Sequence, residues 1–148
     1  MTDPRHRPVL SIEDSDQDFV SLARAFQYAG AQNPLHRCAD GKTAIAALGP
    51  GAECDVARNC ALILLDLNLP GTQGCELLEL FRSHDRITPV IILSTSSHPE
   101  DIVSCYRAGA NGYLIKPLEF ERLEAMMVKV TAFWLDTNLL PPSPRAGT

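Results

Sequence analysis

The sequence predicts an α/β domain with a doubly wound, five-stranded parallel sheet. Short apolar runs recur along the 148 residues, and segments with apolar residues three and four positions apart separate them. The runs at 62–65 and 89–93 are apolar throughout, as strands buried on both faces of a parallel sheet are. Strands that alternate with helices favour a sheet covered by helices on both faces, and a chain of this length holds one such domain.

The first strand is expected at residues 9–12, and the first helix runs from there to Tyr28. Ser15 caps the amino end of this helix, and two aspartates in its first turn complement the positive end of the helix dipole. Apolar residues three and four positions apart give the helix a buried stripe, and Gly30 ends it.

The middle of the chain contains weak indications of secondary structure, followed by the clearest strand of the sequence. Residues 35–39 are a weak strand candidate, 42–48 a short helix, and 49–59 a polar loop that is long for an α/β unit. The next strand belongs to an apolar run that ends at Asp66, just before a proline turn. This run is far shorter than the roughly 20 apolar residues of a membrane span.

The remaining elements complete the alternation. They are a helix at 75–83, a strand at 89–93, a helix from Pro99 to about Ala108, a strand at 112–116 and a helix from 119 to about 135. The domain is therefore expected to cover residues 8–135, between a flexible tail at 1–7 and a proline-rich, disordered tail at 136–148.

Composition and charge exclude several classes of protein. A net charge of -5 with scattered Lys and Arg argues against nucleic acid as a direct partner. The five cysteines form neither a CxxC pair nor a Cys/His cluster, so we expect free thiols and no zinc site. Because no apolar export signal is present, we expect the protein in the cytoplasm and not in a membrane.

Polar residues follow four of the predicted strands. They are Glu13 with Asp14, Asp66, Ser94 with Thr95, and Lys116. Because the carboxyl ends of parallel strands share one edge, three carboxylates should converge there, and a magnesium ion would offset their repulsion. A lysine and a hydroxyl beside such an ion suit a site that receives a phosphoryl group.

Over residues 8–135, these motifs resemble the receiver domain of two-component response regulators. The matching motifs are Glu13-Asp14, Asp66-x-Asn68-x-Pro70-Gly71, Ser94, and Gly112-Tyr113-x-x-Lys116-Pro117. The resemblance implies a CheY-like, flavodoxin-like (βα)5 fold. It also implies a phosphoacceptor switch, not an enzyme, whose output is conformational change, protein binding or phosphorelay.

The same resemblance implies that Asp66 accepts a phosphoryl group from a histidine kinase. Lys116 would contact that group, Ser94 would hydrogen-bond it, and Tyr113 would be the aromatic switch. The Lys116–Pro117 bond is expected to be cis, as in the family.

The magnesium ion would be held by Glu13, Asp14, Asp66 and the carbonyl of Asn68. Taken singly, each site residue has an ordinary structural explanation, such as an acidic helix terminus or a turn aspartate. Their convergence on one sheet edge favours the phosphoacceptor. One departure concerns Thr95, which stands where receivers usually have a smaller residue.

The end of the chain carries a narrower resemblance and a candidate interface. Phe133-Trp134-Leu135 followed by Leu139-Leu140 resembles the stand-alone response regulators paired with bacterial phytochromes, which implies a light-sensing kinase as partner. One apolar row of the final helix packs on the sheet, and Met126 and Phe133 flank this row and widen the apolar face, as in a homodimer interface. The row consists of Leu123, Met127, Val130 and Trp134. The candidate interface residues are Met126, Phe133, Trp134, Leu139 and Leu140. The alternative is a monomer whose tail covers this patch.

Two other functions remain as alternatives. A haloacid-type, magnesium-dependent phosphatase or phosphotransferase also uses an aspartate nucleophile, but it expects a second aspartate where Asn68 stands. A flavodoxin-like cofactor binder expects a phosphate loop after the first strand, where the acidic pair Glu13-Asp14 stands instead.

Overall fold

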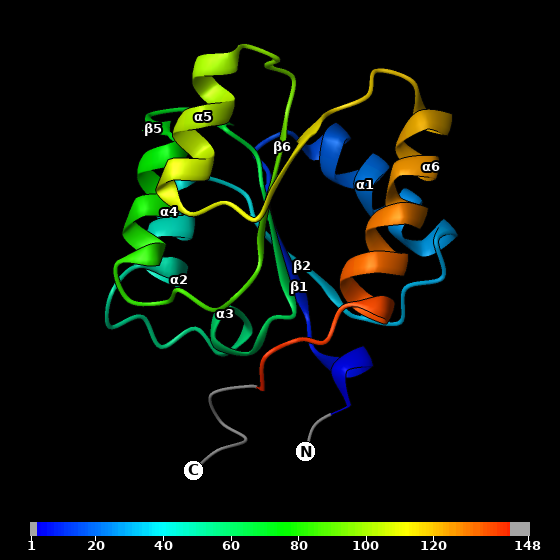
Figure 1. The fold of residues 1–148 in the computed structure, drawn as a ribbon, viewed down its shortest axis with the longest axis horizontal. Coiled ribbons are helices and arrows are strands. Elements are labelled where there is room, and N and C mark those ends of the chain that lie inside the picture. Colours follow the sequence, from blue (N-terminus) through cyan, green and yellow to red (C-terminus); the bar gives the residue numbers. More distant parts are fainter. Residues whose placement is uncertain (1–2, 143–148) are drawn as a thin grey trace.

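A five-stranded sheet forms the middle layer of the computed structural model, which describes residues 3–142 (Figure 1). Its strands are β1 (Val9–Ile12), β2 (Leu35–Cys38), β3 (Leu62–Leu65), β6 (Val90–Ser94) and β7 (Gly112–Ile115). The order across the sheet is β2-β1-β3-β6-β7, and all neighbours are parallel. The predicted fold class is therefore confirmed. The chain changes direction across the sheet at β1 and β3, where sheets of this kind bind ligands at the carboxyl ends of the strands.

Helices cover both faces of the sheet (Figure 1). On one face lie α1 (Asp16–Tyr28) and α6 (Phe120–Val130), and on the other lie α2 (Gly41–Leu48), α4 (Gly74–Arg82) and α5 (Pro99–Ala108). The hydroxyl of Ser15 accepts a hydrogen bond of 3.2 Å from the Asp18 amide, as the predicted cap requires.

The core consists of two apolar clusters, one on each face of the sheet. All residues of β1, β3 and β6 are buried, because these strands have a neighbour on each side and helices above and below. This buried centre holds the strand ends in fixed positions, so that side chains following β1, β3 and β6 share one edge of the sheet.

Three short elements occur where the sequence predicted a loop and a turn. The loop at 49–59 contains the one-turn helix α3 (Asp55–Asn59), which is too short to show a helical period. After Asp66, β4 (Asn68–Leu69) and β5 (Thr72–Gln73) pair as an antiparallel hairpin. Gly71 turns this hairpin with a φ of +74°, a conformation that favours glycine.

The final helix differs from the expected α-helix in its last turns. After α6 the chain forms a π-helix, η2 (Thr131–Thr137), in which the Asn138 amide donates to the Phe133 carbonyl at 2.6 Å. The wider turn brings Leu135 into the core, whereas Trp134 is only half-buried. The predicted buried row therefore ends in Leu135 and not in Trp134.

The amino and carboxyl segments meet at the edge of the sheet opposite the site. Residues Pro4–His6, which precede the sheet, form a short 3-10 helix, η1. The buried guanidinium of Arg7 donates to the carbonyls of Asn59, Cys60 and Pro141 at 3.1, 2.9 and 2.7 Å. The last part of the proline-rich tail, from residue 143 onward, lies outside the described residues.

Two further findings concern the backbone of residues 3–142. No peptide bond in this range is cis, so the expectation of a cis Lys116–Pro117 bond is wrong. The trans form is preferred by X–Pro bonds in general, and with it Lys116 still points to the carboxylates at the sheet edge. In the same range, no helix has the length and apolar character needed to cross a membrane.

Candidate functional site

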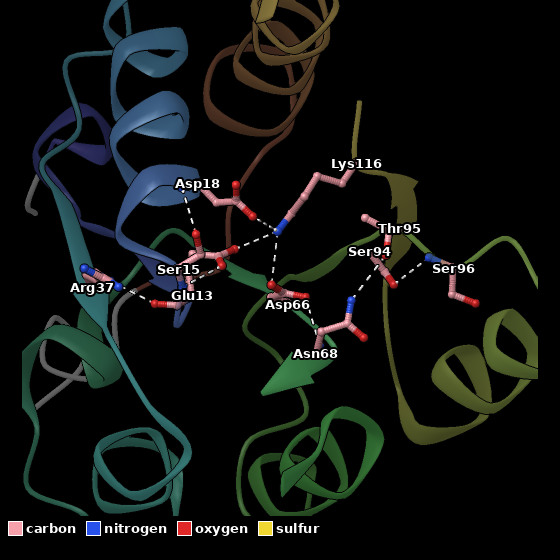
Figure 2. A network of polar contacts seen from close by, with 10 residues as sticks. All are labelled: Glu13, Ser15, Asp18, Arg37, Asp66, Asn68, Ser94, Thr95, Ser96 and Lys116. Carbon is pink, nitrogen blue, oxygen red and sulfur yellow. Dashed lines mark hydrogen bonds and ion pairs between the residues drawn. The ribbon is translucent and has the colours of Figure 1, made fainter. Parts of the chain in front are cut away.

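The side chains that follow β1, β3, β6 and β7 converge at the carboxyl edge of the sheet (Figure 2). Asp66 comes directly after β3, and its carboxylate is buried. One oxygen, Oδ1, accepts a hydrogen bond of 2.9 Å from the Asn68 amide, and the other, Oδ2, lies 3.0 Å from Lys116 Nζ. These two contacts fix the orientation of the carboxylate toward the centre of the site.

Lys116 is the cation at the centre of this arrangement. Its amide donates to the Ser94 carbonyl at 2.7 Å, which anchors the segment after β7 to the end of β6. Its Nζ lies 2.9 Å from Glu13 Oε2, 3.0 Å from Asp66 Oδ2 and 3.1 Å from Asp18 Oδ2. Glu13 and Asp66 are buried, whereas Asp18 is half exposed. One ammonium group therefore faces three carboxylates.

Burial and charge shift the ionisation of this group of residues. Burial, together with the charge of Asp66, raises the pKa of Glu13 to about 7, although hydrogen bonds from Lys116 and the Ser15 amide oppose the shift. Burial lowers the pKa of Lys116, but the hydrogen bonds and charges of Glu13 and Asp66 outweigh burial and raise it. The ionised form of the buried Glu13 is therefore disfavoured in this site, whereas the ionised form of Lys116 is favoured.

The carboxylates also form a candidate metal centre. Oxygen atoms of Glu13, Asp14 and Asp66 lie within 4.8 Å of one another. Carboxylate oxygens are the ligands that Mg²⁺ and Mn²⁺ prefer, and Lys116 alone does not balance the charge of the cluster. The donor set therefore fits a hard divalent cation.

Ser94 and Tyr113 are linked through Ser96. Ser94 is fully buried, and its hydroxyl accepts a hydrogen bond of 3.1 Å from the Ser96 amide. The Tyr113 hydroxyl donates to the Ser96 carbonyl at 2.8 Å, and its ring packs against the core. Thr95 is exposed, and its hydroxyl accepts a bond of 3.3 Å from the Asn68 amide group (Figure 2). Neutral groups therefore line this side of the site.

Two contacts of the site were not predicted from the sequence. Asp18 was interpreted only as a partner of the helix dipole, because its ion pair joins residues 98 positions apart. Arg37 donates to the Glu13 carbonyl at 2.8 Å and to Asp16 at 2.7 Å. No local pattern signals either contact, since both depend on how the strands and α1 are placed.

The candidate interface residues lie outside this site, and the structure does not expose all of them equally. Phe133 is 50% and Leu139 94% exposed. Met126, Trp134 and Leu140 are half-buried and pack against the core on the α1 and α6 face. The surface available to a second molecule is therefore centred on Phe133 and Leu139.

Residues 9–128 match the model of the response regulator receiver domain family. Response regulator Rcp1 of Synechocystis sp. is 32% identical over 145 residues, which is 95% of this chain and 99% of Rcp1. The structure of Rcp1 in its Mn²⁺-bound form superposes with a TM-score of 0.80 at 32% identity, covering 92% of this chain and 99% of that one.

Solved structures of two further regulators are similar. The phosphorylated cyanobacterial phytochrome response regulator RcpA gives a TM-score of 0.83 at 32% identity, covering 93% of this chain and 99% of RcpA. The bacteriophytochrome response regulator RtBRR gives a TM-score of 0.68 at 31% identity, covering 95% of this chain and 87% of RtBRR.

Proposed function

This chain belongs to the response regulator receiver domain family, and from that premise we propose that Asp66 is its phosphoacceptor, which a histidine kinase phosphorylates. The observation that carries this assignment is the position of Asp66, whose carboxylate is buried at the end of the central strand and contacts Lys116 at 3.0 Å. Asp14 and Glu13 lie beside it in the same acidic cluster.

In the proposed reaction, a carboxylate oxygen of Asp66 attacks the phosphorus of a phosphohistidine. The P–N bond breaks, the imidazole leaves with the bonding electron pair, and an acyl phosphate forms on Asp66. Lys116 is positioned to pair with a phosphoryl oxygen. We propose that the Ser94 hydroxyl donates a hydrogen bond to another phosphoryl oxygen. The chain itself supplies these groups, so a small phosphodonor should also serve.

We propose magnesium as the resident cation, held by Glu13, Asp14, Asp66 and the carbonyl of Asn68. The close approach of the three carboxylates supports this set. When bound, the ion would offset the negative charge of the carboxylate and the incoming phosphoryl group. Mn²⁺ in the similar Rcp1 supports a divalent cation at this kind of site.

The partner of the proposed reaction is a light-sensing kinase of the bacteriophytochrome class. The similarity to RcpA and RtBRR supports this pairing. The net charge of -5 argues against direct contact with nucleic acid, and we place the chain in the cytoplasm, a reducing compartment that suits its five free thiols. Asn68, in place of a second aspartate, favours a switch with self-catalysed phosphotransfer over a haloacid-type enzyme.

The assignment of Asp66 is tested with acetyl phosphate and magnesium, followed by intact mass. The unmutated protein should gain one phosphoryl group, and Asp66→Asn should gain none. Asp136→Asn, which removes an exposed aspartate from η2, is the matched control and should be labelled normally. Undiminished labelling of Asp66→Asn would place the acceptor elsewhere.

We also propose a homodimer through the end of the chain, because Phe133 and Leu139 are large apolar side chains in water. Sedimentation should give a dimer at micromolar concentration, and a Phe133→Ala, Leu139→Ala double variant should be monomeric. The matched control is Ile87→Ala, which removes another exposed apolar side chain, 69% exposed, from a different surface. A monomer in the unmutated protein, with and without phosphodonor, contradicts the dimer.

A further inference from the structure

Two cysteine thiols face each other between α4 and α5. The sulfur atoms of Cys75 and Cys105 lie 3.1 Å apart, although 30 positions separate these residues in the sequence. All five cysteines of the chain are free thiols. Because α4 and α5 pack side by side against the same face of the sheet, the sheet and the core hold these two sulfurs together.

The two thiols differ in their surroundings. Cys105 is fully buried, and burial, together with the neighbouring Cys75, raises its pKa to about 12. Cys75 is partly exposed and is the second residue of α4. An oxidant from solution therefore meets Cys75 first, and Cys105 lies behind it within reach.

We propose that Cys75 and Cys105 form a reversible disulfide when a hydroperoxide oxidises the chain. The Cys75 sulfur attacks an oxygen of the peroxide, the O–O bond breaks, the thiol proton passes to the leaving oxygen, and a sulfenic acid and an alcohol or water result. The Cys105 sulfur then attacks the Cys75 sulfur, the S–O bond breaks, and water leaves with the Cys105 proton. Two electrons pass from the two sulfurs to the peroxide, and a dithiol returns them by thiol exchange.

This disulfide would tie together two segments that lead from the candidate site. α4 follows the hairpin that begins at Asn68, and α5 follows the segment with Ser94 and Ser96. The sulfurs must approach from 3.1 Å to about 2.05 Å, so the two helices must shift slightly toward each other. Resting on the proposed function, we expect the bond to change the rate at which Asp66 is phosphorylated.

The disulfide is tested on the full, reduced chain with hydrogen peroxide, followed by alkylation of the remaining thiols, intact mass and peptide mapping. The unmutated protein should lose two hydrogens and yield a Cys75–Cys105 linked peptide, and dithiothreitol should reverse both changes. Cys54→Ser is the matched control, because Cys54 is also partly exposed but lies in another part of the fold, and it should behave like the unmutated protein.

Two variants separate the roles of the two thiols. Cys75→Ser should not form the disulfide, and Cys105→Ala should stop at a sulfenic acid on Cys75 that a sulfenic-acid reagent traps. A linked peptide from another cysteine pair, a disulfide between two chains, or failure to link under excess peroxide overturns the proposal. The absence of a trapped sulfenic acid in Cys105→Ala, with Cys75 still alkylated, also overturns it.

A second readout separates this inference from the proposed function. Labelling by acetyl phosphate is compared between the oxidised and the reduced chain, with Cys75→Ser treated in the same way. A rate that changes only in the unmutated protein supports the link between the disulfide and the site. An unchanged rate overturns that link and leaves the disulfide standing, whereas no labelling of either form contradicts the function of Asp66 and not the disulfide.

Discussion

On one side of the candidate site, buried charged groups form ion pairs. On the other side, neutral hydroxyl and backbone groups form hydrogen bonds. The charged half consists of Glu13, Asp66 and Lys116, whose side chains are at most 14% exposed. The hydroxyl half consists of Ser94, Ser96 and Tyr113, linked by two hydrogen bonds of 3.1 and 2.8 Å.

The two halves differ in the free energy that is lost when one interaction partner is removed. Removing one partner of a buried ion pair leaves an uncompensated charge and costs about 3–5 kcal/mol, whereas a neutral hydrogen bond contributes about 1 kcal/mol. The charged half is therefore fixed in place before a phosphoryl group arrives. The hydroxyl half can rearrange at low cost, as a switch between two existing conformations requires.

The largest effect is expected from Lys116→Met, which removes the cation of the charged half. Without a divalent ion, the buried carboxylates of Glu13 and Asp66 lose their partner, and the free energy of unfolding should fall by about 3–5 kcal/mol. Tyr113→Phe, the control in the hydroxyl half, should cost about 1 kcal/mol. Urea unfolding in the presence of EDTA measures both. Equal losses would remove the distinction between the halves.

Divalent cations should stabilise the protein through the acidic cluster of Glu13, Asp14 and Asp66. At a magnesium concentration about 100 times its Kd, the free energy of unfolding should rise by about 2.7 kcal/mol. Asp14→Asn should weaken this response, because it removes one of the three clustered carboxylates. Ser94→Ala should keep it. Thermal melts with magnesium or EDTA provide the comparison, and an unchanged response in Asp14→Asn would count against the proposed ligand set.

The charged half should also make stability depend on pH. Folding raises the pKa of Glu13 from 4.5 to about 7, so the folded protein binds this proton more tightly than the unfolded chain. Metal-free protein should therefore lose on the order of 2 kcal/mol of stability as pH rises from about 4.5 to 7. Hydrogen bonds lower the pKa values of Asp40 and Asp85. The stability that these two groups contribute is therefore already complete above a pH of about 4.5, and they do not add to the change between pH 4.5 and about 7.

Glu13→Gln is the variant that identifies the source of this pH dependence. Urea unfolding in EDTA at several pH values should show a flatter profile for Glu13→Gln than for the unmutated protein. Ser94→Ala should keep the unmutated slope. A profile that is equally steep in Glu13→Gln would assign the dependence to another group.

The smallest effect on stability, but a clear one on switching, is expected from Ser94→Ala. It leaves the Ser96 amide without its acceptor and should cost about 1 kcal/mol. Adding a phosphodonor should change the rate of amide hydrogen exchange in α5, β7 and α6 of the unmutated protein. In Ser94→Ala this change should be lost. Exchange that responds to phosphodonor equally in Ser94→Ala would exclude the serine from the switch.

The sequence predicted most of the fold because its apolar runs and helix caps are local signals. Ser15 and Gly30 mark the ends of α1 correctly, and the all-apolar runs mark β3 and β6. α3 and the β4–β5 hairpin were missed because elements of five and two residues show no period. The π-helix was missed because its wider turns shift the buried row from Trp134 to Leu135 without changing the composition.

For the candidate site, the sequence predicted which residues share an edge but not which atoms meet. The strand ends bring Glu13, Asp66 and Lys116 together as expected. The pairing of Asp18 with Lys116 and of Tyr113 with Ser96 depends on the placement of α1 and of the segment after β6. Such contacts follow from packing between distant segments, which no short pattern encodes.

The Arg7 guanidinium has a consequence for how the chain can be tagged or shortened. It fastens the carbonyl of Pro141 to the amino-terminal edge, next to the half-buried Leu140. A chain cut between Arg7 and β1 would leave three backbone carbonyls without this donor, and the segment that carries Leu139 would lose its attachment. Asp66, the proposed phosphoacceptor, lies at the opposite edge of the sheet and keeps its own contacts. Such a cut, or a tag that disturbs the Arg7 contacts, should therefore loosen the terminal segments and leave the candidate site in place.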